Sequence, residues 1–509
     1  MPMKIILVAI NAKFIHSSLS VRCLRSENVH VREFTINQPE DLIISELFSQ
    51  SPDMLAFSCY IWNIEMVNSI VRTFRKILPS VKIILGGPEI TEEHENADIS
   101  VIGEGELAFK EIIEGNQALK KVYKTTEVVA LEDIPFAYTK FEENKILYYE
   151  SSRGCVNNCA YCLSSTTKGV RFMPMERAKA DLFVFLSNKV KQVKFVDRTF
   201  NSNKKHATEI WRYLIENDNG TSNFHFEIAG DLLDDDMLSL IAQARKGLFQ
   251  FEIGVQSTNE KTLNAIGRKT NTAKLFENVA KLKTAGNVHL HLDLIAGLPF
   301  EDYSTFVRSF NDVMRCYPDK FQLGFLKLLK GSALRADANK YGIKFKDSAP
   351  YEILENDFIS FAELNTLKKV ENMLDLFYNS SGFKTYIKYM MRENPYDFFH
   401  SLALYWEQKG YHLLAHKKMA LYTILYEFSD RSLKARELLK FDMLCWENIR
   451  SFPYWIEEYY RYDNKNLTKF SGIHTFKYDI FSDALQEKEI RVSFNYKGGS
   501  TNVSSLGRN

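Results

Sequence analysis

Short, nearly continuous apolar runs alternate with amphipathic helical patterns over the first 130 residues. The runs show no in–out alternation, which is typical of parallel strands that are covered on both faces. Strands are expected at residues 4–10, 53–58, 81–85 and 99–102, and helices at residues 19–24, 63–78 and 107–114. This order predicts an α/β fold that begins with a doubly wound (Rossmann-like) parallel sheet, whose ligand crevice lies beyond the carboxyl ends of the strands.

A second series of strand and helix patterns extends from residue 151 to about residue 342, and a strand at residues 146–149 leads into it. Strands are expected at residues 146–149, 193–196, 224–228, 248–253, 288–295 and 321–329. Polar residues and glycines follow these strands, and in α/β barrels the carboxyl ends of the strands form the rim at which sites are built. The pattern therefore predicts six β/α units with a site at one rim, joined to the first sheet by a connector at residues 120–150.

The last third of the chain changes character. Helical periodicity at residues 362–378, 402–408 and 413–427 predicts a mostly helical accessory domain, with strands expected at 475–478 and 491–495. The final segment, residues 498–509, is rich in Gly, Ser and Asn and is expected to be disordered. Two interpretations of the aromatic residues stay open, a hydrophobic core and a substrate pocket. These residues are Trp406, Tyr411, Tyr422, Tyr426 and Phe428. We expect domains at residues 1–130, 131–345 and 346–509.

Composition argues against two classes of protein. The 509 residues carry 65 Lys and Arg against 64 Asp and Glu, a net charge of +1, so we expect no global attraction to nucleic acid. No apolar run approaches the ~20 residues that a membrane-spanning helix needs. No secretory leader is recognised, and we expect a soluble, cytoplasmic protein without a membrane partner.

Three cysteines, Cys155, Cys159 and Cys162, stand in one polar loop as C-x3-C-x2-C. Such a triplet can ligate three corners of a 4Fe-4S cluster and leave the fourth iron without a protein ligand. A zinc site is the alternative, but it usually has four ligands in two pairs, and no second Cys or His pair follows at suitable spacing. Disulfides are not expected, because the other four of the seven cysteines are scattered singly.

The cysteine spacing, with Tyr161 just before the last cysteine, resembles the signature of radical S-adenosylmethionine (SAM) enzymes. The resemblance implies a partial (β/α)6 barrel and a fourth iron chelated by the amino and carboxylate groups of SAM. It also implies reductive cleavage of SAM to a 5′-deoxyadenosyl radical, a chemistry of the cofactor that the protein binds and orients. A flavodoxin or ferredoxin-type electron donor is then expected as a partner.

The downstream segments GVQS, AIGRKT and LDLIAGLPFED resemble the SAM-binding strands of the branch that includes oxygen-independent coproporphyrinogen oxidase. The resemblance implies contacts to the ribose, carboxylate or amino group of SAM. The residues concerned are Glu227, Gln256, Arg268 and Asp293, with Tyr161 at the adenine. Residues 196–199 replace the usual glycine-rich segment after the second strand, so that Asp197 or Thr199 is expected to contact the amino group.

Three of these residues also have a structural interpretation. Arg268 could cap the end of a helix, and Glu227 could be an ordinary exposed carboxylate. Asp293 lies within an apolar strand, where an unpaired carboxylate is costly, and it therefore requires either a basic partner or a ligand.

Two segments upstream of the cysteines, LGGPEIT and VIGEGELAF, resemble the cobalamin-binding domain of cobalamin-dependent radical SAM enzymes. The implied contacts lie at strand ends and are Asn11, Ser58, Gly86, Gly87, Gly103 and Gly105. The D-x-H-x-x-G motif, whose His ligates cobalt in many cobalamin proteins, is absent, and His16 is the candidate axial ligand, with a loop residue as the alternative. A nucleotide-binding domain is the other interpretation, although no G-x-G-x-x-G follows the first strand.

The C-terminal region, with FLKLLKGSALR and FYNSSGF, resembles the uncharacterised (DUF4080-like) domain of one subgroup of cobalamin (B12)-binding radical SAM proteins. The resemblance implies an enzyme with 4Fe-4S, SAM and cobalamin cofactors that methylates, rearranges or cyclises an unactivated carbon of a small-molecule substrate. A methylthiotransferase-like RNA modifier is one alternative, but Cys23 and Cys59 alone cannot provide that family's second cluster. A non-catalytic cobalamin or iron–sulfur sensor is the other, and it would need no open iron.

Overall fold

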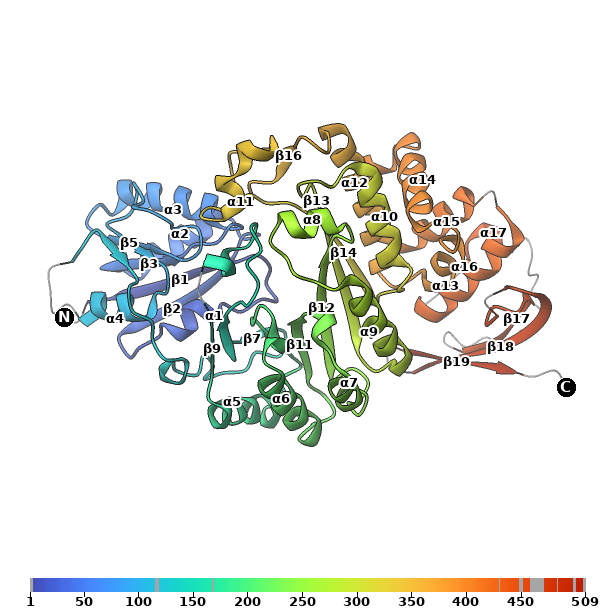
Figure 1. The fold of residues 1–509 in the computed structure, drawn as a ribbon, viewed down its shortest axis with the longest axis horizontal. Helices are drawn as coiled ribbons and strands as arrows, with labels where there is room; N and C mark the ends of the chain where they lie inside the picture. The colour runs from blue at the N-terminus through green and yellow to red at the C-terminus, as the bar shows by residue number, and fades with distance from the viewer. Residues whose placement is uncertain are drawn as a thin grey trace. The chain divides into compact units, whose positions relative to one another are not determined.

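The computed structural model describes residues 3–114, 119–166, 169–429, 431–447, 452–457, 471–482, 484–497 and 500–506 (Figure 1). The chain divides into two compact units. The first comprises Met1–Phe306 and Leu323–Phe361, and the second Val307–Gln322 and Ala362–Asn509. Most of the first two predicted domains therefore lies in one unit, whereas residues 307–322 belong to the other. The boundaries at residues 130 and 345 stay a prediction.

The first sheet of the larger unit is parallel and has the strand order β2-β1-β3-β4-β5-β6. Its strands are β1 (Ile5–Asn11), β2 (Val29–Thr35), β3 (Met54–Ser58), β4 (Lys82–Gly86), β5 (Ile99–Ile102) and β6 (Val122–Lys124). Four of these strands were predicted, whereas β2 was missed and β6 lies in the expected connector. Because β1 and β3 are neighbours and β2 lies on the far side of β1, the strand order reverses at β1/β3, the place where open sheets bind ligands.

Helices cover both faces of this sheet, as the predicted doubly wound fold requires. Ile6, Val8 and Ile10 of β1 belong to a core shared with α2 (Glu40–Ser49) and α3 (Ile64–Ile77). The alternate residues of β1 belong to a second core, shared with α1 (Leu19–Cys23) and α4 (Glu106–Glu114). Both sets of side chains on β1 are buried, which explains the unbroken apolar run in the sequence.

The second sheet has the order β14-β13-β12-β11-β10-β7 and forms the predicted partial barrel. Its strands are β7 (Leu147–Tyr149), β10 (Gln192–Phe195), β11 (Asn223–Ile228), β12 (Phe249–Gln256), β13 (His289–Ala296) and β14 (Lys320–Phe325). The strands from β7 to β13 pair in parallel. The helices between them are α5 (Met175–Ser187), α6 (Lys204–Glu216), α7 (Asp235–Ile241), α8 (Glu260–Ala265), α9 (Thr272–Ala285) and α10 (Tyr303–Met314).

The second unit is mainly helical, with a small antiparallel sheet at its end. Its principal helices are α12 (Phe361–Met373), which continues as a π-helix (Leu374–Asn379), α13 (Lys384–Met390), α14 (Pro395–Gln408), α15 (Lys418–Phe428) and α16 (Leu433–Trp446). Trp406, Tyr422 and Tyr426 are at most 5% exposed, which supports the hydrophobic-core interpretation of these aromatic residues.

The terminal sheet corrects one expectation. Its strands are β17 (Ser471–Tyr478), β18 (Glu487–Lys497) and β19 (Ser500–Leu506). The first two contain the predicted strands, but the third lies in the segment that was expected to be disordered. That expectation was wrong for β19, because the strand is in register with β18 from Lys497↔Ser500 to Arg491↔Leu506 and gains a complete ladder of backbone pairing that composition alone does not reveal.

Candidate active site

A short hairpin holds the three cysteines at the rim of the barrel. Its antiparallel strands, β8 (Ser152–Gly154) and β9 (Val170–Phe172), enclose the cysteine loop and follow β7 directly. Gly154 has φ +108°, and a Cβ at this residue would lie 2.2 Å from the carbonyl oxygen of Gly169. Only glycine permits this approach of two backbones. The hairpin was not predicted, and it confines the cysteines to one small segment at the end of the first barrel strand.

Contacts from neighbouring β/α units seat the loop on the rim. The Ala160 N–H donates to the carbonyl of Ile266 at 2.8 Å. Gly267, with φ +69°, comes so close that a Cβ would lie 2.8 Å from a carbonyl oxygen of the loop. On the other side, the Thr199 hydroxyl lies 3.4 Å from the sulfur of Cys155. The loop therefore contacts the segments that follow β10 and β12, at the carboxyl ends of the strands, where the site was expected.

Arg268 links the cysteine loop to β12. Its guanidinium donates to the carbonyl of Gly254 at 2.5 Å and lies 3.8 Å from the sulfur of Cys159. Burial raises the pKa of the Cys159 thiol, and the charge of Arg268 opposes that effect. A neighbouring cation favours the thiolate, which is the form that ligates iron. The side chain thus points to the cysteines, and not to a helix end as the capping interpretation required.

Two buried polar atoms beside Gly254 have no hydrogen-bond partner among the described residues: Oε1 of Gln256 and Nε of Arg268. Gln256 has φ +69°, and a Cβ added at Gly254 would lie 2.2 Å from its Nε2. Buried polar groups are normally paired, so a ligand with one donor and one acceptor is expected here. The amino and carboxylate groups of SAM provide both, and these residues therefore fit the cofactor.

Asp293 joins this group from the next strand. It is the register partner of Gly254 in the β12/β13 pair, so the two residues lie at the same level of the sheet. Three of the four predicted SAM contacts, Gln256, Arg268 and Asp293, are therefore brought together around Gly254. The fold alone achieves this, because 37 residues separate Gln256 from Asp293 in the chain (293 − 256).

Glu227 lies on β11, one strand farther along. Its carboxylate is 3.5 Å from Nζ of Lys194 and 3.8 Å from the guanidinium of Arg198, and its side chain is 24% exposed. Burial raises the pKa of Glu227, against the opposing effects of Arg198 and Lys194. It is therefore a partly buried carboxylate with basic neighbours and not the freely exposed one of the structural interpretation.

Asp197 lies beneath the cysteine loop. It is fully buried and accepts hydrogen bonds from the Ser151 N–H at 3.0 Å, the Ser151 hydroxyl at 2.7 Å and the Ser152 hydroxyl at 2.6 Å. Because its oxygens are engaged by the strand end that leads into the loop, Thr199 is the better placed of the two predicted amino-group contacts. Tyr161 adjoins Cys159, and burial raises the pKa of its hydroxyl.

The environment of Asp197 predicts a pH dependence of stability. Burial raises its pKa from 3.8 to about 7. The folded state therefore binds a proton between pH 4 and pH 7 that the unfolded state releases, so this group's contribution to stability falls as pH rises through that window. We expect Tm to fall more from pH 5 to pH 7.5 in the wild type than in Asp197→Asn, by the equivalent of roughly 1–3 kcal/mol. Parallel Tm profiles of the two proteins would contradict this assignment.

The predicted cobalamin contacts follow the strands of the first sheet. Asn11, Ser58 and Gly86 end β1, β3 and β4, Gly87 comes next, and Gly103 and Gly105 follow β5. Two of these side chains serve the domain itself: Asn11 donates to Glu33 at 2.9 Å, and the Ser58 hydroxyl lies 2.9 Å from that of Ser20. Gly87 has φ +111° and a Cβ would lie 2.6 Å from the Cys59 carbonyl oxygen, so its turn alone requires glycine.

Large apolar side chains are exposed at the β1/β3 switch point. Phe14 and Ile15 follow β1 and are 66% and 44% exposed, and Trp62, which follows β3, is 43% exposed. The Trp62 indole donates to the Ile10 carbonyl at 3.0 Å and stacks on Tyr60, with 4.3 Å between ring centroids. Exposed apolar side chains that follow both strands of the switch point suit a large macrocyclic ligand. These residues therefore fit cobalamin, although the sequence did not single them out.

His16 connects the first sheet to the barrel. Its Nδ1 lies 2.7 Å from the hydroxyl of Tyr148 on β7, and the residue forms an isolated β-bridge with Ile146. Burial lowers the pKa of His16, so the neutral ring is favoured. Because Tyr148 engages Nδ1, Nε2 is the nitrogen left for a metal, and the axial-ligand assignment stays a prediction.

Arg153 makes the most extensive ion-pair network of the site. Its guanidinium contacts Glu104 at 2.7 Å, Glu106 at 2.9 Å and Glu150 at 2.7 Å, and Arg171 pairs with the other oxygen of Glu104. Glu104 and Glu106 belong to the segment after β5, whereas Arg153 lies two residues before Cys155 in the sequence. The side chain therefore ties the cysteine loop to the predicted cobalamin crevice.

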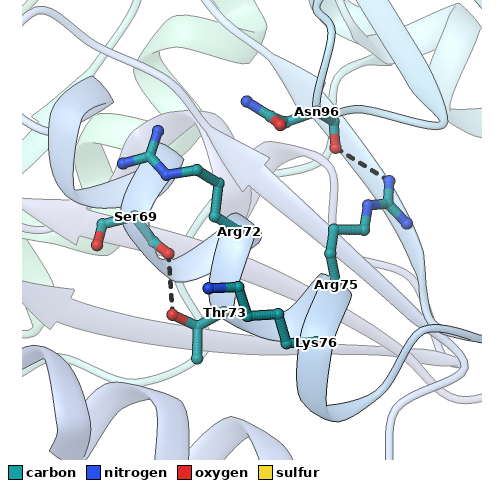
Figure 2. A pocket seen from close by; sticks show the side chains of 6 residues that line it. All are labelled: Ser69, Arg72, Thr73, Arg75, Lys76 and Asn96. Atoms are coloured by element: carbon teal, nitrogen blue, oxygen red, sulfur yellow. Dashed lines mark hydrogen bonds between the residues drawn. The ribbon is translucent and has the colours of Figure 1, made fainter.

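A hollow of about 370 Å³ on the first sheet's domain is not part of this site (Figure 2). It is lined by Ser69, Arg72, Thr73, Arg75, Lys76 and Asn96. Arg75 is already engaged, with hydrogen bonds to the Asn96 carbonyl at 3.0 Å and to Asp98 at 2.9 Å. These residues belong to α3 and to the turn before β5. The end of α3 and this turn lead into β4 and β5, at the amino ends of the strands and away from the crevice.

Three family models match the chain. A B12 binding domain matches residues 8–113, the radical SAM superfamily matches residues 149–313, and a protein of unknown function (DUF4080) matches residues 339–495. The chain therefore carries an N-terminal B12-binding domain and a radical SAM domain, followed by the C-terminal domain of the predicted subgroup.

Curated relatives match one half to two thirds of the chain. The chain is 25% identical over 397 residues to the cobalamin-dependent radical SAM methyltransferase TokK of Streptomyces tokunonensis, with 68% of this chain and 51% of that protein covered. It is 25% identical over 313 residues to 2-(S-pantetheinyl)-carbapenam-3-carboxylate methyltransferase of Streptantibioticus cattleyicolor, with 51% and 44% covered. The chain thus spans about half the length of these relatives.

Solved structures share the fold at lower identity. OxsB, a cobalamin-dependent SAM radical enzyme, gives a TM-score of 0.57 at 15% identity, with 86% of this chain and 78% of that chain covered. TsrM from Kitasatospora setae, solved with cobalamin and a [4Fe-4S] cluster, gives 0.54 at 13% identity, with 69% and 82% covered. Together with the family matches, these findings imply 4Fe-4S, SAM and cobalamin as cofactors. None of the described helices is long and apolar enough to cross a bilayer.

Proposed function

We propose that the protein is a cobalamin-dependent radical SAM methyltransferase that acts on an unactivated carbon of a small molecule. The Arg153 network carries the proposal, because it joins the cysteine loop to the segment after β5 in one compact unit. An enzyme that combines two cofactors must keep their sites at a fixed distance and orientation, because small misplacements lower the reaction rate. Relatives named as methyltransferases support this reaction class.

The chain's own residues bind and orient the cofactors in this proposal. When bound, the cluster and SAM supply a 5′-deoxyadenosyl radical, and cobalamin supplies a transferable methyl group. Cys155, Cys159 and Cys162 would hold the cluster. Arg268 would pair with the carboxylate of SAM, and Oε1 of Gln256 would accept from its amino group. Asp293, Glu227, Thr199 and Tyr161 are the remaining proposed contacts.

The second enzyme class, a methylthiotransferase-like RNA modifier, has weaker support. The chain is 23% identical to a ribosomal protein uS12 methylthiotransferase RimO of Chlamydia abortus, with 52% of this chain and 56% of that protein covered. A second cluster would have to use Cys23 and Cys59, and burial raises the pKa of both thiols to about 12. Neither thiol is therefore disposed to become a thiolate ligand.

An external electron donor and a reducing compartment complete the proposal. A flavodoxin or ferredoxin-type protein would deliver the electron. We propose a cytoplasmic location, because all seven cysteines lie in the described part of the chain and are free thiols. The balanced net charge of +1 gives no support to a nucleic-acid partner.

Anaerobic reconstitution tests the proposal. The protein loaded with iron, sulfide and methylcobalamin should form 5′-deoxyadenosine from SAM in the presence of a reductant, and Cys159→Ser should abolish the product. Cys316→Ser, a cysteine outside the motif, is the matched control and should retain activity. Bound cobalamin without 5′-deoxyadenosine would favour the sensor, and failure to retain cobalamin would favour a nucleotide-binding first domain.

A further inference from the structure

The inner wall of the barrel carries a polar cluster that extends beyond the proposed cofactor contacts. Along β11, β12 and β13, fully buried apolar side chains alternate with polar ones. The apolar set packs on the helix side, where Phe226 and Phe251 contact Trp211 of α6. The polar set lies on the opposite face of the sheet and includes His225, Glu227, Gln250, Glu252, His291 and Asp293. Such a polar face is costly unless its members bind one another or a ligand.

Three of these residues have the spacing of metal ligands. His225, Glu252 and His291 each offer one ligand atom, and these atoms lie within 4.8 Å of one another. Nε2 of His225 and Oε2 of Glu252 are 3.0 Å apart, about the separation of two ligands that each bind one ion at ~2.0–2.2 Å. Glu252 and His291 are direct partners in the β12/β13 register, so paired strands hold them in place.

The hydrogen bonding of His225 points independently to a missing ligand. The residue is 5% exposed, and its Nε2 is buried without a well-aligned hydrogen bond among the described residues, even though Glu252 is close. Among the described residues, the contact with Glu252 is the polar contact of this nitrogen, and a metal ion on its lone pair would engage that carboxylate as well.

We propose that His225, Glu252 and His291 bind a divalent first-row transition-metal ion inside the barrel. Two imidazoles and one carboxylate suit Zn²⁺, Fe²⁺ or Mn²⁺ and leave coordination positions open. Gln250 lies 2.8 Å from the His291 ring and would hold its orientation, as outer residues of metal sites commonly do.

The position of the ion along β12 and β13, relative to the rim of the barrel, indicates its role. Gly254 and Asp293 lie two residues beyond Glu252 and His291 on the same strands, toward the rim that carries the cysteine loop. An ion at this level would bind a carboxylate or another oxygen ligand of the substrate below the SAM contacts. This role rests on the proposed function, whereas the binding of the ion does not.

Lys194 is the competitor for the same carboxylate. Its Nζ lies 3.0 Å from Oε2 of Glu252 and 3.5 Å from Oε1 of Glu227. In a pure ion-pair network, Lys194 would neutralise Glu252 and no ion would be needed. Because Lys194 also contacts Glu227, it keeps a carboxylate partner when Glu252 binds a metal ion. The ion pair and the metal site can be distinguished by experiment.

Metal titration of the anaerobic holoprotein, with its cluster assembled, tests the site. We expect one Zn²⁺ per chain to survive desalting, and Co²⁺ to give a d–d absorption spectrum without the intense sulfur charge-transfer bands of cysteine ligation. His225→Asn and His291→Asn should each weaken Zn²⁺ binding by more than the ~10–100-fold that loss of an outer partner costs. Unchanged cluster iron and Tm would show that these variants are folded.

Two control variants decide between the ion and the ion-pair network. Lys194→Met keeps the three ligands and removes the competitor, so it should bind Zn²⁺ as tightly as the wild type or more tightly. His30→Asn, at an exposed histidine, should leave the binding unchanged. Three results would overturn the proposal. They are binding of less than one Zn²⁺ per chain, equal Zn²⁺ affinity in His225→Asn and the wild type, and Zn²⁺ binding that appears only in Lys194→Met. Formation of 5′-deoxyadenosine is measured separately, so failure of either proposal leaves the other standing.

Discussion

Replacing Arg268 by methionine should lower kcat/KM for SAM by about 10²–10³, the usual effect of removing one preorganised donor from a water-poor site. The guanidinium lies 3.8 Å from the Cys159 sulfur and 2.5 Å from the Gly254 carbonyl oxygen, and its buried Nε has no partner among the described residues. Methionine fills a similar volume but supplies neither the charge nor the donors. We therefore expect cluster assembly to persist while SAM binding is lost.

The measurement is the initial rate of 5′-deoxyadenosine formation over a range of SAM concentrations, at equal iron content. Arg268→Lys should recover only part of the loss, because an ammonium keeps the charge but not the planar fork that matches a carboxylate. Lys269→Met, at the exposed neighbouring residue, is the matched control. A KM for SAM that is the same in Arg268→Met and the wild type would remove Arg268 from the binding site.

Arg153→Met should weaken the connection between the cysteine loop and the predicted cobalamin crevice. The change leaves Glu104, Glu106 and Glu150 without their shared cation, and their side chains are only 17–20% exposed. Removing one partner from a buried ion pair costs about 3–5 kcal/mol. Because these groups keep some contact with water, we expect about 2–4 kcal/mol of lost stability. Methyl transfer should fall more than SAM cleavage, because the SAM contacts are untouched.

Denaturant unfolding together with the ratio of methylated product to 5′-deoxyadenosine measures both effects. Arg75→Met is the matched control, since Arg75 also pairs with a carboxylate of this domain but lies toward the amino ends of the strands, away from the crevice. Glu104→Gln in a double-mutant cycle should show a coupling energy to Arg153 of at least about 0.5 kcal/mol, as for residues in one network. Equal losses of cleavage and transfer in Arg153→Met would show that the network supports only the cluster.

The sequence predicted the site best where a strand pattern is followed by residues whose side chains have a characteristic chemistry. Fully buried strands produced unbroken apolar runs, and the C-x3-C-x2-C spacing marked the loop at the barrel rim. Gln256, Arg268 and Asp293 were proposed from the resemblance of their motifs to SAM-binding strands, and the structure brings them together around Gly254. Asp197 shows the limit of this approach, since its position at a strand end did not reveal that Ser151 and Ser152 engage its carboxylate.

The missed elements share one physical cause, which is that their stability comes from partners distant in the sequence. The β2 strand, VHVREFT, is partly polar because it lies at a sheet edge, and β19 is almost entirely polar but pairs with β18. The β8/β9 hairpin depends on the close approach of Gly154 to Gly169, a contact that the local sequence pattern does not predict. The exposed Trp62 and Phe14 likewise indicate a ligand site only because the fold places them at the β1/β3 switch point.

By itself, the sequence determined most of the strands and helices, the cysteine triplet and the class of cofactor chemistry, because each depends on residues that are close in the chain. Only the tertiary structure decided which side chains meet. It joined Arg153 to Glu104 and aligned His225, Glu252 and His291 across three strands. Parallel strands are connected through helices, so neighbours across the sheet are tens of residues apart in the chain, and their pairing is specified by register and packing, not by any local signal.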